Sequence, residues 1–297
     1  MTTEILRPPP DGSPIPRFDE GWVSGPSVAP YLSYMGEPSP EGWSGDLEAL
    51  HGNSTTDHFI DLWTREAVVA ALRAANLPAS PVILDLGCSS GLMTAEVLRA
   101  WPDAFIIGLD AEADGLAAAH AAMPGVPFIH ASGTDLPLTD ACVDALASLN
   151  VLEHIPDDVR VLEEVLRVLR PGGGAVVVVR YNPAHYDDYD IHLQHARRYE
   201  RNEMAKKGRS AGLVPVTSAC LGSVLYPAFW ATKKAHRRRH PSPSPVERQQ
   251  LVENDIQSTR HALVGRLAHR VERRLLAAGV RPGFGIRQVT VFRKPQD

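Results

Sequence analysis

Short apolar runs alternate with amphipathic stretches between Pro81 and Val179, and this alternation restricts the fold more than any other feature of the sequence. Strands that alternate with helices predict a parallel sheet covered by helices, with right-handed connections. The expected strands lie at 82–84, 105–107, 128–130, 143–149 and 175–179, and the expected helices at 92–100, 114–122 and 157–169. We therefore predict a doubly wound α/β fold.

The regions outside this core differ from it in composition. Residues 1–50 hold many of the 25 prolines, which predicts an extended arm. Thr56 and Asp57 are the expected N-cap of a helix that ends near Asn76. Four further elements are expected after residue 179: a helix at 199–207, a strand at 213–221, a long helix at 246–278 and a strand at 289–292. The expected parts are thus an arm at 1–50, a core at 51–222, a helical basic insertion at 223–282 and a last core strand at 283–297.

The two ends of the chain differ in charge. Residues 1–200 carry 11 Lys and Arg against 29 Asp and Glu, whereas residues 201–297 carry 19 against 6. The run from Lys233 to Arg239 is expected to be a solvated face, with RNA or anionic lipid as the alternative ligand. An uncharged segment from Ser210 to Thr232 precedes it, but its Pro and Gly residues argue against a membrane span.

Cysteine usage bears on the cellular compartment. Three cysteines without a CxxC pair exclude a disulfide framework and a cysteine-built zinc site. Since Met1 to Pro10 also has no signal-peptide pattern, we expect a cytoplasmic protein. Only five of the 30 basic residues are Lys, a composition typical of a GC-rich bacterial source.

The segment Val82–Gly91, VILDLGCSSG, is the strongest functional signal. It predicts a buried strand, a turn of small residues and then a helix. Gly87 and Gly91 have no side chain, so backbone N–H groups and a helix N-terminus can approach a ligand there. The spacing is G-x-S-x-G and differs from the G-x-G-x-x-G of dinucleotide sites.

Polar residues also follow the next expected strands. Asp110 ends the second strand, where a carboxylate can accept hydrogen bonds from both hydroxyls of a ribose. Asp135 follows the third strand within SGTDLPL, where it would lie beside an adenine. Each residue also has a structural explanation: Gly87 and Gly91 as turn glycines, Asp110 as a helix cap and Asp135 as a solvated acid.

Together with Leu169–Gly173 (LRPGG), these segments resemble the class I S-adenosylmethionine-dependent methyltransferases, particularly the type 11, small-molecule branch that includes the quinone methyltransferases. The resemblance covers residues 82–179 and loosely the remainder, including His195–Tyr199 (HARRY). It implies a Rossmann-like seven-stranded sheet whose last strand is antiparallel. Ser89 stands where the family usually has its middle glycine.

The resemblance also implies S-adenosylmethionine as cofactor and a set of residues that hold it. In order along the cofactor, these are Asp85, Gly87, Cys88, Ser89 and Gly91 for the methionine moiety, Asp110 and Ala111 for the ribose, Thr134, Asp135 and Leu136 for the adenine, and Asn150 and Val151 beside the sulfonium.

An acceptor hydroxyl or protonated amine must lose a proton during methyl transfer, and a histidine is a suitable general base. His154 follows the fourth strand and is the first candidate; capping the helix that begins near Pro156 is its alternative role. His195 and Tyr181 are further candidates. The polar segment between them is expected to bind the acceptor, because its His and Asp spacings match no familiar metal site.

The predicted function is methyl transfer from S-adenosylmethionine to a hydroxyl or amine of a small metabolite, in bacterial specialised (antibiotic-type) biosynthesis. A nucleotide-dependent oxidoreductase is the alternative that the glycine spacing disfavours. An RNA- or membrane-associated methyltransferase that uses the basic C-terminal region is the other alternative. We expect no nucleic-acid partner and no transmembrane span, while peripheral membrane contact and the oligomeric state stay open.

Overall fold

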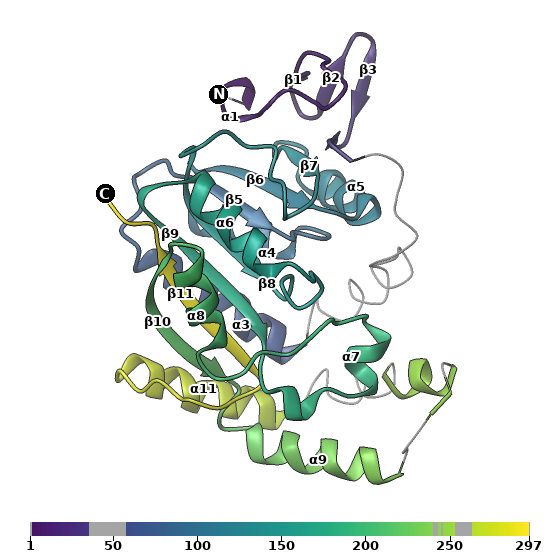
Figure 1. Ribbon diagram of the computed structural model, residues 1–297, viewed down its shortest axis with the longest axis vertical. Helices are drawn as coiled ribbons and strands as arrows, with labels where there is room; N and C mark the ends of the chain where they lie inside the picture. Colours follow the sequence, from purple (N-terminus) through teal and green to yellow (C-terminus); the bar gives the residue numbers. More distant parts are fainter. Residues whose placement is uncertain (1, 36–57, 240–242, 245, 253–262, 297) are drawn as a thin grey trace.

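A single large sheet runs through the molecule, and helices cover both of its faces (Figure 1). The computed structural model describes residues 2–35, 58–239, 243, 244, 246–252 and 263–296. The strand order is β4-β7-β6-β5-β8-β9-β11-β10. The strands are β4 (Leu32–Ser33), β5 (Val82–Leu86), β6 (Phe105–Asp110), β7 (Phe128–His130), β8 (Val143–Leu149), β9 (Leu169–Arg180), β10 (Val214–Leu221) and β11 (Arg287–Arg293).

The strand directions confirm the predicted doubly wound fold. All pairings from β4 to β9 are parallel, whereas β11 lies antiparallel between β9 and β10. The last strand is thus antiparallel, as expected. Since parallel strands end at one edge of the sheet, the loops that follow β5, β6, β8 and β9 gather there.

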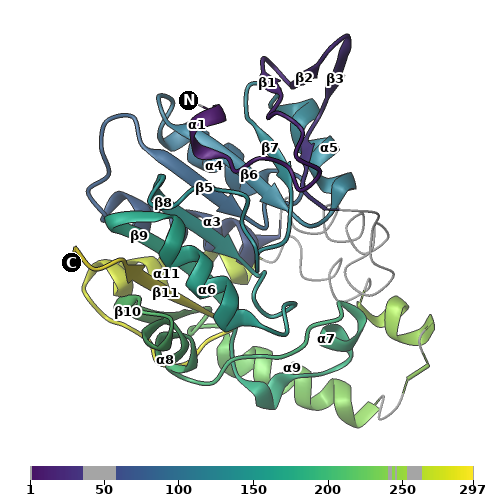
Figure 2. The same ribbon diagram turned by 45° about the horizontal axis from the view of Figure 1, so that its top comes forward.

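Helices lie on both faces of the sheet (Figure 2). One face carries α3 (Phe59–Arg73), α4 (Leu92–Ala100), α5 (Ala113–Ala122) and α11 (Leu263–Ala277), and the other carries α6 (Asp158–Val168) and α8 (Glu203–Ser210). Beyond the end of the sheet lie α7 (Asp188–His192) and α9 (Tyr226–Arg239), while a short α1 (Thr2–Ile5) belongs to the arm and a 3-10 turn lies at Pro183–His185. Neighbouring residues of β5 point to opposite faces, so Ile83 packs with α3 and α4 while Leu84 packs with α6.

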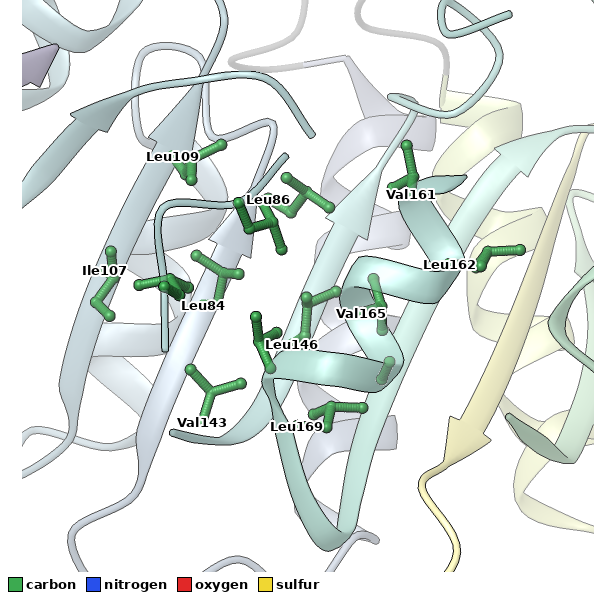
Figure 3. Close-up of a cluster of buried hydrophobic side chains, with 14 of the residues drawn as sticks. Leu84, Leu86, Ile107, Leu109, Val143, Leu146, Val161, Leu162, Val165 and Leu169 are labelled. Atoms are coloured by element: carbon green, nitrogen blue, oxygen red, sulfur yellow. The ribbon is translucent and has the colours of Figure 1, made fainter. Parts of the chain in front are cut away.

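Helix α6 shows why the sequence folds in this way. Val161, Leu162 and Val165 recur at helical spacing and are fully buried. Figure 3 shows Val165 of α6 beside Leu146 of β8, with Leu84 and Leu86 of β5 on the next strand and Leu162 on the other side of the helix. The Asp157 carboxylate accepts a hydrogen bond from the Arg160 N–H and caps the helix. Asp157 therefore caps this helix, and not His154, for which capping was the alternative role.

The sheet has one strand more than the seven expected, and the N-terminal arm supplies it. Strand β4 pairs with β7 at the edge, and β1 (Arg17–Phe18), β2 (Trp22–Ser24) and β3 (Ser27–Ala29) form a small separate sheet. Trp22 is 1% exposed, and its indole N–H donates to the Phe128 carbonyl over 2.8 Å. The arm is not merely extended, because its apolar side chains join the main core.

The structure differs from two expected helices, in the N-cap of the first and in the buried face of the second. Helix α3 begins after His58, whose ring nitrogen accepts from the Ile60 N–H; the expected caps Thr56 and Asp57 lie outside the described residues. Within the expected helix 246–278, residues 246–252 and α11 are helical, and residues 253–262 lie outside the described residues. In α11 the buried face contains Glu272, whereas Leu267 is 63% exposed. Glu272 is turned inward because it accepts hydrogen bonds from Gly222, Ser223 and Val224.

Candidate functional site

The turn after β5 needs its two glycines for conformation and for space. Gly87 has φ +77°, and a Cβ added there would lie 2.0 Å from Cγ2 of Val151. Gly91 has φ +82° and begins α4. The N–H groups of Gly87 and Cys88 donate to the Leu109 carbonyl, over 2.7 and 3.1 Å. These two N–H groups therefore stabilise the turn.

Asp110 joins this turn to the end of β6. Its Oδ2 accepts a hydrogen bond from the Ser89 N–H over 2.7 Å, and its Oδ1 accepts from the Glu112 N–H over 2.9 Å. An ionised carboxylate has about four acceptor positions, so both oxygens can also accept from hydroxyl groups. This arrangement fits the two hydroxyls of a ribose.

Asp85 lies beneath the turn and is 1% exposed. Burial raises its pKa to about 7, against the hydrogen bond that Thr94 donates over 2.6 Å. That bond ties β5 to α4. Asp85 thus fixes the start of α4 relative to β5, and with it the turn between them.

The expected adenine segment follows β7 and starts beside Asp110, since the Ala131 N–H donates to the Asp110 carbonyl over 2.9 Å. Thr134 is half-buried and hydrogen-bonded to Ser132. Asp135 is exposed and pairs with Arg7 of the arm over 2.6 Å, whereas Leu136 is fully buried in the core.

A cavity beside the glycine turn brings together four distant parts of the chain. Its lining consists of Asp61, Arg65, Gly87, Cys88, Ser89, Ser90, Leu92, Met93, Leu149, Asn150 and Arg287. Asn150 has φ +55°, and its Oδ1 is buried without a hydrogen-bond partner among the described residues. Arg65 on α3 and Arg287 on β11 were not identified from the sequence. A carbonyl oxygen and two guanidinium groups suit the amino and carboxylate groups of a methionine moiety.

The candidate bases His154 and His195 lie together. Their ring centroids are 4.6 Å apart, in an edge-to-face arrangement. His195 is 3% exposed, and its Nδ1 is 2.7 Å from Oδ1 of Asp190, which also accepts from Arg198. The third candidate, Tyr181, donates its hydroxyl hydrogen to the Gly283 carbonyl over 3.2 Å, and burial raises its pKa.

Burial lowers the pKa of His195 to about 4, against the hydrogen bond to Asp190, from an ordinary value of 6.5. The unfolded chain therefore gains a proton near pH 6.5 that the folded chain does not bind until about pH 4. We expect the free energy of unfolding to fall over this range, by up to about 3 kcal/mol. His195→Asn keeps a donor toward Asp190 without the titration, so urea unfolding at pH 7, 5.5 and 4.5 should show a smaller fall. Equal falls in both proteins would assign the effect to another group.

A second group of buried charges adjoins the histidines, and the sequence did not indicate that its members come together. The group consists of Asp61, Glu153, Arg180, Asp190, Arg198 and Arg287, and is called the polar cluster below. Arg180 and Arg287 are direct cross-strand neighbours on β9 and β11, which would repel one another without nearby carboxylates. Asp61 accepts a hydrogen bond from Arg287, and Thr64 accepts another over 2.8 Å. A charged residue that ends a buried strand, as Arg180 does, is the signal that could have revealed the cluster.

Comparisons with known proteins point to methyltransferases. A family model described as a methyltransferase domain matches residues 84–177. An uncharacterized methyltransferase of Mycobacterium sp. (strain KMS) is 39% identical over 114 residues, which are 37% of this chain and 44% of that protein. An uncharacterized methyltransferase of Mycobacterium ulcerans (strain Agy99) is 31% identical over 194 residues, which are 62% of this chain and 71% of that protein.

The fold is also that of solved methyltransferases. The Haemonchus contortus phosphoethanolamine N-methyltransferase 2 in complex with S-adenosyl-L-methionine is similar with a TM-score of 0.54 and 13% identity, over 78% of this chain and 52% of that chain. The chain spans about half the length of the first curated relatives that it matches, 44% in the strain KMS protein. Because the M. ulcerans relative is matched over 71% of its length at 31% identity, the chain belongs to the class I S-adenosylmethionine-dependent methyltransferases.

Proposed function

We propose that the protein transfers a methyl group from S-adenosylmethionine to a hydroxyl or amine of a small metabolite, in the cytoplasm and in bacterial specialised biosynthesis. The observation that carries this proposal is Asp110, whose carboxylate ends β6 beside the glycine turn. It lies where a ribose would have to bind if the methyl donor occupies the cavity.

The methyl donor supplies, when bound, an electrophilic methyl group on a positively charged sulfur. Asp110 would hold the ribose, while Arg65 and Asn150 would hold the carboxylate and amino groups of the methionine moiety. Asp85 and Thr94 keep the turn and α4 in register. The chain then has to orient an acceptor and exclude water, because alignment accounts for much of the rate of such a transfer.

His154 is the proposed proton acceptor. Its ring contacts His195, which is hydrogen-bonded to Asp190, and Arg198 in turn donates to Asp190. This fixed neighbour limits the orientation of His154 and supports a role in proton transfer. His195 and Tyr181 are the alternatives, and the low pKa of His195 makes it a weak base.

The basic segment has partners within the protein, which supports a small-molecule acceptor over RNA or lipid. Lys233 pairs with Asp187 over 2.7 Å, and Arg237 donates to the carbonyls of Ala184 and Tyr186. Among the residues that the structure describes, none of the helices has the length and apolar character needed to span a membrane.

A screen of candidate metabolites tests the function directly. Each compound is incubated with the protein and S-adenosylmethionine, and mass spectrometry monitors a gain of about 14 Da, the mass of one added methylene. The gain should require the protein. Methylation of RNA fragments alone, with all small molecules left unchanged, would contradict the proposal.

Asp110→Ala should weaken binding of S-adenosylmethionine by about 1–3 kcal/mol, or roughly 5- to 150-fold. The variant loses two charge-assisted hydrogen bonds to the ligand and also releases the Ser89 N–H. Titration calorimetry measures the affinity, with NAD as the control ligand. Stronger binding of NAD than of S-adenosylmethionine by the wild-type protein would contradict the cofactor assignment.

A further inference from the structure

Glu153 and Arg180 form an ion pair that is buried but not hydrogen-bonded. The distance from Glu153 Oε1 to Arg180 Nε is 3.8 Å, which is too long for a hydrogen bond. Glu153 is 0% exposed and Arg180 is 9% exposed. Both oxygens of Glu153 and the Nε of Arg180 lack a hydrogen-bond partner among the described residues. Such a pair is costly, because little compensates for the lost hydration.

Neighbouring residues hold this pair in place without forming hydrogen bonds to the two Glu153 oxygens or to the Arg180 Nε. The N–H of Ala196 donates to the Glu153 carbonyl over 2.7 Å, which fixes the loop after β8. The guanidinium of Arg180 lies over the ring of Tyr189, with 5.0 Å from its carbon to the ring centroid. Asn150 Oδ1 and Arg287 Nε also lack partners among the described residues, and both residues line the cofactor cavity. Buried polar atoms without partners are thus found both at the lining of that cavity and at the pair.

The chemistry of the open atoms favours an uncharged group. A hydroxyl can donate to Glu153 and accept from Arg180, since an oxygen about 2.8 Å from each closes a triangle on the 3.8 Å separation. A carboxylate would face the two oxygens of Glu153, and an ammonium would face the guanidinium of Arg180. The polar cluster contains three arginines and three carboxyl groups, and burial raises the pKa of the Glu153 carboxyl to about 7.

We propose that Glu153 and Arg180 form the anchoring site of the methyl acceptor, and that the acceptor carries an uncharged hydroxyl there, next to the group that is methylated. This inference rests on the proposed function. Both residues bind and orient the acceptor and take no part in the transfer of the methyl group or of the proton. They hold the acceptor near His154, whose neighbour His195 is bonded to Asp190 of the same cluster.

A stability measurement tests whether the pair exists for binding. Glu153→Leu combined with Arg180→Met replaces both charges by apolar groups, so the urea midpoint should be unchanged or higher than that of the wild type. The control is Asp158→Leu with Lys207→Met, which removes a partly buried pair bonded over 2.6 Å together with the hydrogen bond from Tyr199 to Asp158, and should lower the midpoint. A fall as large as in the control would show that the pair supports the fold, and would overturn the proposal.

A binding measurement tests the chemistry of the ligand. Benzyl alcohol, benzoate and benzylamine share one ring, and saturation-transfer NMR compares them in the presence of S-adenosylhomocysteine. The wild type should prefer the alcohol, and the Glu153→Leu, Arg180→Met variant should bind it at least tenfold more weakly. Preference for either ion, alcohol binding retained in the variant, or no alcohol binding because the pair holds only a water would overturn the proposal.

The proposed function is tested separately in the same samples. Calorimetry with S-adenosylhomocysteine should give equal affinities for the wild type and the double variant, because Glu153 and Arg180 do not line the cofactor cavity. Wild-type protein that fails to bind S-adenosylhomocysteine would contradict the proposed function. Equal cofactor affinities together with unchanged alcohol binding would contradict only the anchoring site.

Discussion

His154→Ala should lower kcat by about 10²–10⁴, with affinity for S-adenosylmethionine nearly unchanged. The reason is that the proton transfer is lost while the cofactor cavity stays intact, since His154 is not among the residues that line this cavity. Single-turnover measurements with the acceptor found in the mass screen give the rate, and calorimetry gives the affinity.

The control is His120→Ala, which removes an imidazole from α5, away from the loop that follows β8. His120 is half-buried, and its removal should leave kcat within about twofold of the wild type because it lies on α5 and not at the loop after β8. A folded His154→Ala protein with a near-normal kcat would remove His154 from the mechanism and leave the cofactor assignment standing. Loss of stability without loss of specific activity would assign it a structural role.

Gly87→Ala should weaken binding of S-adenosylmethionine by roughly 30- to several thousand-fold, or lower stability by the corresponding 2–5 kcal/mol. Two costs combine. An alanine at φ +77° is strained, and its Cβ would lie 2.0 Å from Cγ2 of Val151, on the loop that carries Asn150. Calorimetry and urea unfolding separate the effect on binding from the effect on stability.

Two further variants isolate these costs. Gly125→Ala is the matched control, because a Cβ there meets nothing within 4 Å and its φ lies outside the strained range. Gly87→Ala combined with Val151→Ala removes the collision but keeps the backbone strain, so it should recover part of the loss. Equal behaviour of Gly87→Ala and Gly125→Ala would show that the close approach to Val151 has no consequence.

The parts of the fold that local patterns encode were predicted well. Helix α4 and strands β7 and β8 have the expected bounds, and the glycine turn and Asp110 lie together at the ends of β5 and β6. This succeeds because a period of two or 3.6 residues and the backbone freedom of glycine are properties of a few neighbouring residues.

The arm and the basic region show the limit of such patterns. Pro-rich composition predicts an extended arm, yet Trp22 enters the core and β4 adds an eighth strand. Apolar residues at helical spacing in α11 predict a buried apolar face. In the structure Leu267 is exposed, and Glu272 is buried and accepts three hydrogen bonds. In both cases a partner more than 45 residues away in the chain decides the outcome.

The sequence by itself determined the succession of strands and helices along the chain, the glycine turn after β5 and the carboxylate at the end of β6. Only the tertiary structure decided the polar cluster. Strand β11 inserts antiparallel beside β9 and brings Arg287 opposite Arg180, while the loop after β8 brings Glu153 to the same place. The physical reason is that the energy of a buried charge depends on which charges surround it in space, and no spacing along the chain specifies those neighbours.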